Sequence, residues 1–224
     1  MSQNNQNISS GNLSGAKKSF LQENEKSIIF IVVGIIVLIL LYLGYQKLYL
    51  APRAEKAVSQ MYQAENYAII DSLQKKAIDG DGSFPGFKEI AEEYSNTKSA
   101  NVANAYLGGL YLKQKNFKEA IKYLEQYSET GSAILDPLVI GLLGDAYSEE
   151  KIYDKAANFY KQAADKSSNV YTTPLFLKKL GLVYEELQDY KNAETTYQRI
   201  RDEFPESNES TTIDGFIARV QAKQ

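Results

Sequence analysis

The second half of the chain repeats one spaced pattern three times, and this repetition restricts the possible folds more than any other feature. Each copy begins with Leu-Gly, and a Tyr lies three residues after the Gly. A Phe or Tyr lies six residues after that Tyr, and an Ala lies three residues further on. The alanines of successive copies are 36 and then 37 residues apart. Such a period is typical of a helix pair, and pairs stack into a solenoid because one pair alone cannot bury its apolar face. The copies are Leu107, Gly108, Tyr111, Phe117, Ala120; Leu143, Gly144, Tyr147, Tyr153, Ala156; and Leu180, Gly181, Tyr184, Tyr190, Ala193.

The small residues of the pattern predict close contact between helices. A glycine inside a helix costs about 1 kcal/mol relative to alanine, so its return at one position needs a packing reason. We expect Gly108, Gly144 and Gly181 to lie where the two helices of a pair cross. The partner helix should bring its alanines to the same crossing, with three larger side chains behind them: Leu124, Tyr160 and Tyr197.

Composition excludes several classes of function. The chain has no Cys and no His, which removes thiol nucleophiles, histidine bases, zinc fingers and haem ligation. After residue 50 it carries 21 basic and 26 acidic residues without a basic stripe, so we expect no nucleic-acid partner. The carboxylate pairs Glu149-Glu150 and Glu185-Glu186 diverge by about 100° on a helix and cannot converge on a substrate. We therefore expect neither enzymatic activity nor a cofactor.

The acidic loop from Asp79 to Gly86 can be tested against the pattern of a calcium loop. If Asp79 is the first ligand, the sixth position should be Gly and the twelfth Glu. These positions hold Phe84 and Ile90. We therefore expect a connecting loop and no metal site.

An unbroken apolar stretch runs from Ile28 to Leu43. With the next two residues it would span roughly 27 Å as a helix, close to the hydrocarbon thickness of a bilayer. The alternative is a cleaved signal peptide, whose apolar core is about 7–15 residues long and ends at a small-residue cleavage site. This core is longer, and residues 46–50 offer no such site. The stretch therefore predicts an uncleaved transmembrane anchor.

Positive charge does not decide the orientation of this anchor. Three basic residues lie near each end: Lys17, Lys18 and Lys26 before it, and Lys47, Arg53 and Lys56 after it. The rule that basic residues stay in the cytoplasm therefore gives a tie. A short polar tail most simply remains in the cytoplasm while the large domain crosses the membrane.

The predicted fold is all-α, with a single N-terminal transmembrane helix, an α-solenoid and a C-terminal capping helix. Apolar residues at three- and four-residue steps predict one long helix from Ala54 to about Ile78, while Pro52 should bend or break the chain at Ala51. The expected boundaries are 1–26 for a disordered polar tail, 27–49 for the transmembrane helix, 50–98 for the long helix with a degenerate repeat, 99–206 for three full repeats, and 207–224 for the capping helix and tail.

Helix start and stop signals agree with these boundaries. A capping side chain, followed in two cases by Pro, predicts the start of each full repeat at Ser99, Asp136-Pro137 and Thr173-Pro174. The third repeat should end at Phe204-Pro205. A last apolar stripe suits a helix that covers the final repeat: Ile213, Phe216, Ile217 and Val220.

The recurring positions resemble the tetratricopeptide repeat, strongly over residues 100–207 and weakly over 54–95. The Trp often found early in that motif is absent, and Asn104 occupies its place in the first copy. The layout also resembles a narrower family, the ancillary subunits of the bacterial Sec translocon. The features that carry this resemblance are the N-terminal anchor, the long first helix and the segment from Asp79 to Thr97.

The resemblance implies that ligands lie along the concave face made by the first helix of each pair. On this chain that face would comprise Val102, Ala105, Gly109, Leu112, Lys113; Leu138, Gly141, Asp145, Ser148, Glu149; and Leu175, Lys178, Leu182, Glu185, Glu186. The candidate peptide-groove residues among them are Val102, Leu112, Lys113, Asp145, Glu149, Lys178, Leu182, Glu185 and Glu186. The basic clamp that some members use for a terminal carboxylate is missing, so apolar or basic extended segments would suit this face. The alternative is that its acidic residues only solvate a helix surface.

The resemblance also implies a function. It implies a membrane-anchored protein–protein interaction module in the bacterial inner membrane, with a cytoplasmic N-terminus and a periplasmic repeat domain. Its partners would be translocon subunits, periplasmic chaperones or exported polypeptides. The alternative is a structural scaffold or receptor of another membrane complex, in secretion, motility or wall synthesis, or a cytosol-facing import receptor. Whether a partner or the chain's own tail fills the groove stays open.

Overall fold

The computed structural model describes residues 24–224, and every regular element among them is helical. They belong to two units that divide between Pro52 and Arg53. Most of the predicted polar tail, residues 1–26, lies outside the described residues. The prediction of an all-α fold is confirmed.

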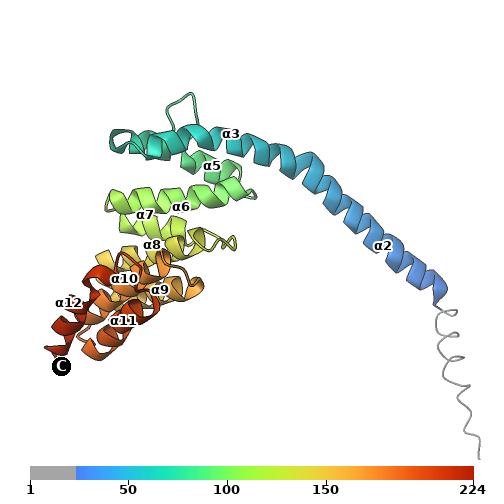
Figure 1. Ribbon diagram of the computed structural model, residues 1–224. Helices are drawn as coiled ribbons and strands as arrows, with labels where there is room; N and C mark the ends of the chain where they lie inside the picture. Colours follow the sequence, from blue (N-terminus) through green and yellow to red (C-terminus); the bar gives the residue numbers. More distant parts are fainter. Residues whose placement is uncertain (1–23) are drawn as a thin grey trace, which may run out of the picture. The chain divides into compact units, whose positions relative to one another are not determined.

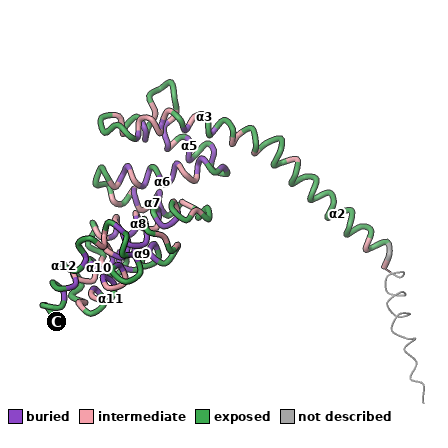
Figure 2. Tube along the Cα trace, viewed as in Figure 1, coloured by how far each residue is buried: buried purple, intermediate pink, exposed green. Residues whose placement is uncertain are grey.

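The first unit contains the apolar helix α2, Glu25–Gly44, followed by a π-helical segment η1, Tyr45–Leu50. Within the part of the chain that the structure describes, one helix is long and apolar enough to cross a membrane, and it includes this segment. The large apolar side chains from Ile29 to Leu43 are all exposed (Figure 2). The apolar stretch therefore packs against none of the described residues of its own unit.

Pro52 does not break the helical backbone as predicted. Ala51 keeps right-handed helical angles, with φ −64° and ψ −48°, and its N–H donates to the carbonyl of Gln46, five residues earlier. Proline lacks an N–H and its ring collides with the carbonyl four residues before it in an α-helix. A wider π-helical turn before Pro52 relieves that collision, because its hydrogen bonds reach one residue further back.

The second unit is a stack of antiparallel helix pairs that follow one another in chain order (Figure 1). Its helices are α3 Ala51–Ala68, α4 Gln74–Asp79, α5 Phe87–Glu93, α6 Lys98–Lys113, α7 Phe117–Leu124, α8 Leu135–Glu149, α9 Tyr153–Lys166, α10 Thr172–Glu186, α11 Tyr190–Glu203 and α12 Ser210–Gln221. The pairs α6–α7, α8–α9 and α10–α11 correspond to the three sequence repeats. The apolar stripe predicted near the C-terminus lies on α12, which packs against α11.

The long helix predicted to reach Ile78 ends ten residues earlier, at Ala68. Ile70 is extended, with φ −108° and ψ 113°, and a 3₁₀ turn η2, Asp71–Leu73, leads into α4. Asp71 accepts a hydrogen bond from Gln74, 2.8 Å away. This bond links two side chains across the new turn. Ile69, which the periodicity placed on the buried stripe, is instead 81% exposed.

The acidic loop between α4 and α5 is organised by the chain's own donors. Asp81 accepts hydrogen bonds from the backbone N–H groups of Ser83 and Phe84 at 2.9 and 2.8 Å, and from the Tyr67 hydroxyl at 2.6 Å. The bond from Tyr67, and then those from the two amides, lower the pKa of Asp81. This carboxylate closes a turn.

The contact predicted for the repeat glycines is confirmed. A Cβ atom on Gly108 would lie 2.3 Å from the Leu124 side chain, one on Gly144 would lie 2.6 Å from the Tyr160 ring, and one on Gly181 would lie 2.2 Å from the Tyr197 ring. Such distances are far inside van der Waals contact. The repeat alanines are fully buried on the partner helices: Ala120, Ala156 and Ala193.

The first helix of every full repeat ends in the same left-handed turn. Lys115, Lys151 and Gln188 have φ of 58°, 60° and 59°. In each case the next residue donates its backbone N–H to the carbonyl of the repeat tyrosine, at 2.8–2.9 Å. This is the Schellman arrangement, which normally places Gly at the left-handed residue. The turn therefore recurs without the residue that usually marks it.

The predicted helix caps are wrong by a few residues. Ser99 lies inside α6, and Thr97 is the cap, accepting from the Ala100 N–H. Asp136 and Thr173 likewise lie in the first turns of α8 and α10. Proline is tolerated anywhere in the first turn, where backbone N–H groups lack intrahelical partners, so the Pro signal does not set the first residue uniquely. The predicted stop is confirmed, since α11 ends at Glu203, directly before Phe204.

We expect Gly144→Ala to lower the free energy of unfolding by about 1–3 kcal/mol, because the added methyl group must displace the packed Tyr160 ring. The matched control is Gly215→Ala on α12, where nothing lies within 4 Å of the new Cβ. That change should raise stability by about 0.4–1 kcal/mol. Urea unfolding of the full chain in detergent measures both, and equal effects of the two substitutions would contradict close packing at Gly144.

Candidate peptide-binding groove

Two neighbouring pockets lie along the first helices of the repeats. The larger, here called the apolar pocket, has a volume of about 1070 Å³ and lies mainly between α6 and α8, with the end of α3 beside it. The smaller, here called the charged pocket, has a volume of about 680 Å³ and lies between α8, α10 and α12. Four residues line both pockets: Ser148, Glu149, Tyr160 and Lys179.

Aliphatic and aromatic side chains supply most of the wall of the apolar pocket. Leu138 and Tyr106 are 36% and 37% exposed, so a large part of each side chain remains uncovered. The apolar lining residues are Ala68, Ile69, Val102, Ala105, Tyr106, Gly109, Leu110, Leu112, Phe117, Leu135, Leu138, Val139 and Leu142. Concave apolar surface with a few polar groups at its rim is the usual form of a ligand site.

The structure brings most of the candidate groove residues together. The apolar pocket is lined by Val102, Leu112, Lys113, Asp145 and Glu149. The charged pocket is lined by Glu149 together with Leu182, Glu185 and Glu186. Lys178 lines neither pocket, and its ammonium group lies 4.9 Å from the centre of the Phe216 ring.

Gly141 does not belong to the concave surface, although the repeat pattern placed it there. It is buried, and a Cβ atom at this position would lie 1.9 Å from the Phe176 ring. The expectation for Gly141 was therefore wrong. This glycine lets the next repeat's aromatic residue pack directly on the α8 backbone.

Asp145 is engaged within the protein. Its carboxylate accepts hydrogen bonds from the Lys179 ammonium group at 2.6 and 2.8 Å and from the Tyr160 hydroxyl at 2.7 Å. Burial, and then the nearby carboxylate, raise the pKa of Tyr160, so this hydroxyl remains protonated and donates. The three side chains come from α8, α9 and α10, and together they form the partition between the two pockets.

Glu185 is also engaged, here by the capping helix. It accepts a hydrogen bond from the Tyr197 hydroxyl at 2.8 Å and from Arg219 Nε at 3.0 Å, and Lys223 lies 3.8 Å away. Partial burial alone would raise the pKa of Glu185, but the bonds from Arg219 and Tyr197 outweigh it and lower that pKa. Glu185 therefore ties α12 to the third repeat.

Sequence analysis missed the residues that neutralise these two acids. Lys179 and Arg219 each lie 34 residues after their carboxylate partner. That spacing, close to one repeat, is the only sequence signal that would have linked them. This spacing of 34 residues identifies the ion pairs only when adjacent repeats are known to place the two positions side by side.

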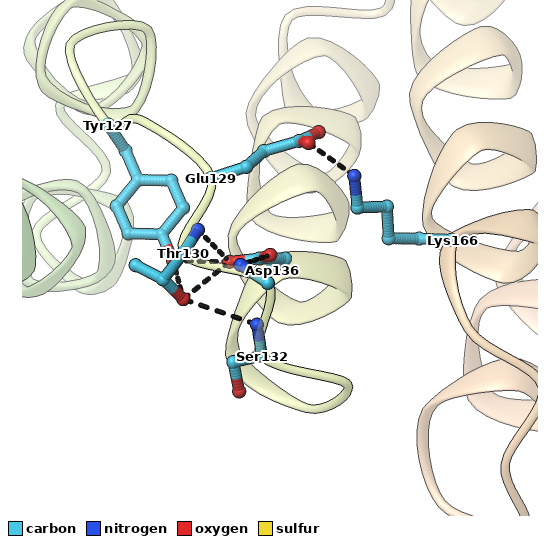
Figure 3. Close-up of polar contacts among 7 residues, drawn as sticks. Tyr127, Glu129, Thr130, Ser132, Asp136 and Lys166 are labelled. Atoms are coloured by element: carbon cyan, nitrogen blue, oxygen red, sulfur yellow. Dashed lines mark hydrogen bonds and ion pairs between the residues drawn. The ribbon is translucent and has the colours of Figure 1, made fainter.

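A polar loop holds the start of α8, and with it the groove residues Leu135 and Leu138. Figure 3 shows Asp136 at the centre of this loop, where it is fully buried. Its carboxylate accepts from the Tyr127 hydroxyl at 2.7 Å, the Thr130 N–H at 2.9 Å and the Gly131 N–H at 2.8 Å. The loop is thus closed onto the helix by one carboxylate.

Three further contacts, also drawn in Figure 3, strengthen the loop. The Thr130 hydroxyl donates to Asp136 at 3.0 Å and accepts from the Ser132 N–H at 3.3 Å. Glu129 forms an ion pair with Lys166 at the end of α9. Burial would raise the pKa of Asp136, but the hydrogen bonds outweigh it and hold this pKa at about 2, below the ordinary value of 3.8.

We expect Asp136→Asn to lower the free energy of unfolding at pH 7 by about 1–3 kcal/mol, because the amide cannot accept from all of these donors. The carboxylate's contribution should be complete above its ordinary pKa of 3.8 and should disappear as the pH falls towards its folded pKa of about 2. Thermal unfolding of both proteins between pH 5 and pH 2 measures this. The exposed Asp154, in the first turn of α9, provides the control. Asp154→Asn removes only a favourable interaction with the helix dipole and should lower the free energy of unfolding by less than about 1 kcal/mol. A stability difference between wild type and Asp136→Asn that stays constant to pH 2 would contradict the assignment.

The sequence of this chain matches a known protein family. The family described as tetratricopeptide repeat-like domain matches residues 18–199, which is more than half of the chain. A comparison with curated proteins gives no match.

Proposed function

We propose, since this chain belongs to the tetratricopeptide repeat-like domain family, that it is a membrane-anchored interaction module serving as an ancillary component of the bacterial Sec translocon. Domains of this family are typically non-catalytic and bind other proteins. The observation that carries the proposal is the extent of the match, residues 18–199, which includes the apolar helix as well as the repeats. An apolar segment and a repeat domain thus belong to one family unit.

The exposure of the apolar helix supports the anchor. α2 has 20 residues, which corresponds to about 30 Å of helix and to the hydrocarbon thickness of a bilayer. Its large apolar side chains from Ile29 to Leu43 are exposed. Leaving so much apolar surface in water would be unfavourable by roughly 25 cal/mol per Å². A lipid bilayer removes that cost and leaves the repeats at its surface.

Tethering is the mechanism that we propose for binding. When the groove and its partner are both held at the membrane, the effective concentration of the partner near the groove is high. A weak contact is then enough for the partner to occupy the groove. The repeat domain would lie in the periplasm, with the N-terminus in the cytoplasm of a bacterial cell. There the groove would meet exported polypeptides or periplasmic chaperones, and the anchor would hold it beside the translocon.

The proposal predicts that translocon subunits co-purify with the full chain from bacterial inner membranes solubilised in a mild detergent. A control chain carries an unrelated transmembrane helix in place of residues 24–50. Retention of the subunits by the control would assign the contact to the repeat domain, and their loss would assign it to the anchor. Recovery of another envelope complex, with translocon subunits absent from both preparations, would contradict the Sec assignment and favour a scaffold elsewhere.

The proposed orientation predicts that a protease added to intact spheroplasts cleaves the repeat domain. An exposed chain segment is cut wherever the protease reaches it, so external digestion reports the side of the membrane. Immunoblotting against the C-terminal helix should show loss of the full-length band, while a cytoplasmic marker survives. Protection of the repeat domain until the spheroplasts are lysed would place it in the cytoplasm.

A further inference from the structure

Ion pairing within the protein leaves only part of the groove charge for a partner. Asp145 is neutralised by Lys179, and Glu185 by Arg219. Among the ion pairs and side-chain hydrogen bonds of residues 24–224, none involves the carboxylate of Glu149 or Glu186. These two carboxylates lie in the last turns of α8 and α10, where the negative ends of the helix dipoles add to their charge. Of the two, Glu149 lines the apolar pocket and offers it an available negative charge.

The end of α6, one repeat earlier, has the opposite charge. Lys113 and Lys115 both line the apolar pocket at this end. Lys113 lies 3.7 Å from Asp71, but the two side chains are 61% and 89% exposed, and such a pair contributes little. Lys115 takes part in no ion pair among the described residues. Around the apolar pocket, the available charge thus changes from positive at Lys113 and Lys115 to negative at Glu149. Lys151, which follows α8, lines the charged pocket and not the apolar one.

The apolar side chains lie next to these charged residues, on the bodies of the same helices. Tyr106 belongs to α6, whereas Leu138 and Leu142 belong to α8. A partner that covers them must present apolar side chains to gain from their burial. Packed helices lie about 10 Å apart. A chain in the polyproline II conformation rises about 3.1 Å per residue with three residues per turn, so side chains three positions apart lie on the same face and cover that distance.

We propose that the groove binds a polypeptide segment in which an acidic residue and a basic residue, about three positions apart, flank apolar side chains. The acidic side chain faces Lys113 and Lys115, the apolar side chains cover Leu138 and its neighbours, and the basic side chain faces Glu149. The charge order sets the direction in which the segment crosses the helices. This inference rests on the proposed function as an interaction module and names the class of ligand for its groove.

The experiment measures the affinity of the full chain in nanodiscs for a fluorescent peptide with the order Asp-Leu-Leu-Lys between Gly and Ser residues, at low ionic strength. Glu149→Lys should weaken binding about threefold to tenfold, because reversal of one rim charge replaces an attraction by a repulsion. Exchange of the peptide Lys for Glu should restore binding to that variant and weaken binding to wild type. Such reciprocal rescue comes only from a direct pairing of the two charges.

Matched controls separate the groove from general effects. Glu150→Lys adds the same charge at the neighbouring exposed position, which lines neither pocket, and should leave the affinity unchanged. Leu138→Asn should weaken binding, whereas Leu187→Asn, at a leucine of almost equal exposure outside both pockets, should not. Equal effects of Glu149→Lys and Glu150→Lys, or of the two leucine variants, would overturn the proposal.

A second copy of the chain is the other possible occupant of the groove, and sedimentation distinguishes it from a peptide. If a second copy of the chain fills the groove, the nanodisc-free protein in detergent will sediment as a dimer that Glu149→Lys dissociates, and that result would also overturn the proposal. The translocon co-purification described above provides independent information. Loss of peptide selectivity with translocon subunits still retained would reject the ligand class alone, whereas loss of the subunits with selectivity intact would reject only the Sec assignment.

Discussion

The contact between a residue without a side chain on one helix and a large side chain on its partner sets the geometry of each repeat. Gly144 receives the ring of Tyr160, and Gly181 receives that of Tyr197. No atom can be added at these glycines without moving a packed ring. The separation of the two helices at their crossing is therefore set by the contact between the glycine backbone of one helix and the aromatic ring of the other. The stacking of repeats, and with it the concave surface, follows from that distance.

The same tyrosines connect the core to the groove. The ring of Tyr160 packs against Gly144, while its hydroxyl holds Asp145, which in turn binds Lys179 of the next repeat. Tyr197 makes the corresponding link through Glu185 to the capping helix. Residues that fill the core therefore also decide which carboxylates are neutralised, so the charge offered to a partner differs from the charge counted in the sequence.

Much of the candidate site could be predicted from the repeat, because equivalent positions of a periodic fold lie on equivalent faces. Glu149 and Leu112 line a pocket, and their role in binding stays a prediction. Gly141 is buried instead, where it receives Phe176 from the neighbouring repeat. Lys178 lines neither pocket, and Phe216 of the capping helix lies against it. Contacts between repeats depend on side chains that no single repeat contains.

By itself the sequence determined the helical repeat, the small residues at the helix crossings, the length of the apolar segment and the absence of thiol and imidazole chemistry. These follow from composition and periodicity, which are local properties of the chain. Only the tertiary structure decided where α3 ends, that Lys115 adopts a left-handed turn, and that Asp136 closes a loop instead of capping a helix. Each of these involves hydrogen bonds between groups that lie close in the sequence, such as Asp71 with Gln74, Asn116 with Tyr111 and Asp136 with Thr130. Several donors and acceptors compete for such bonds, and the periodicity of apolar residues does not show which of them pair.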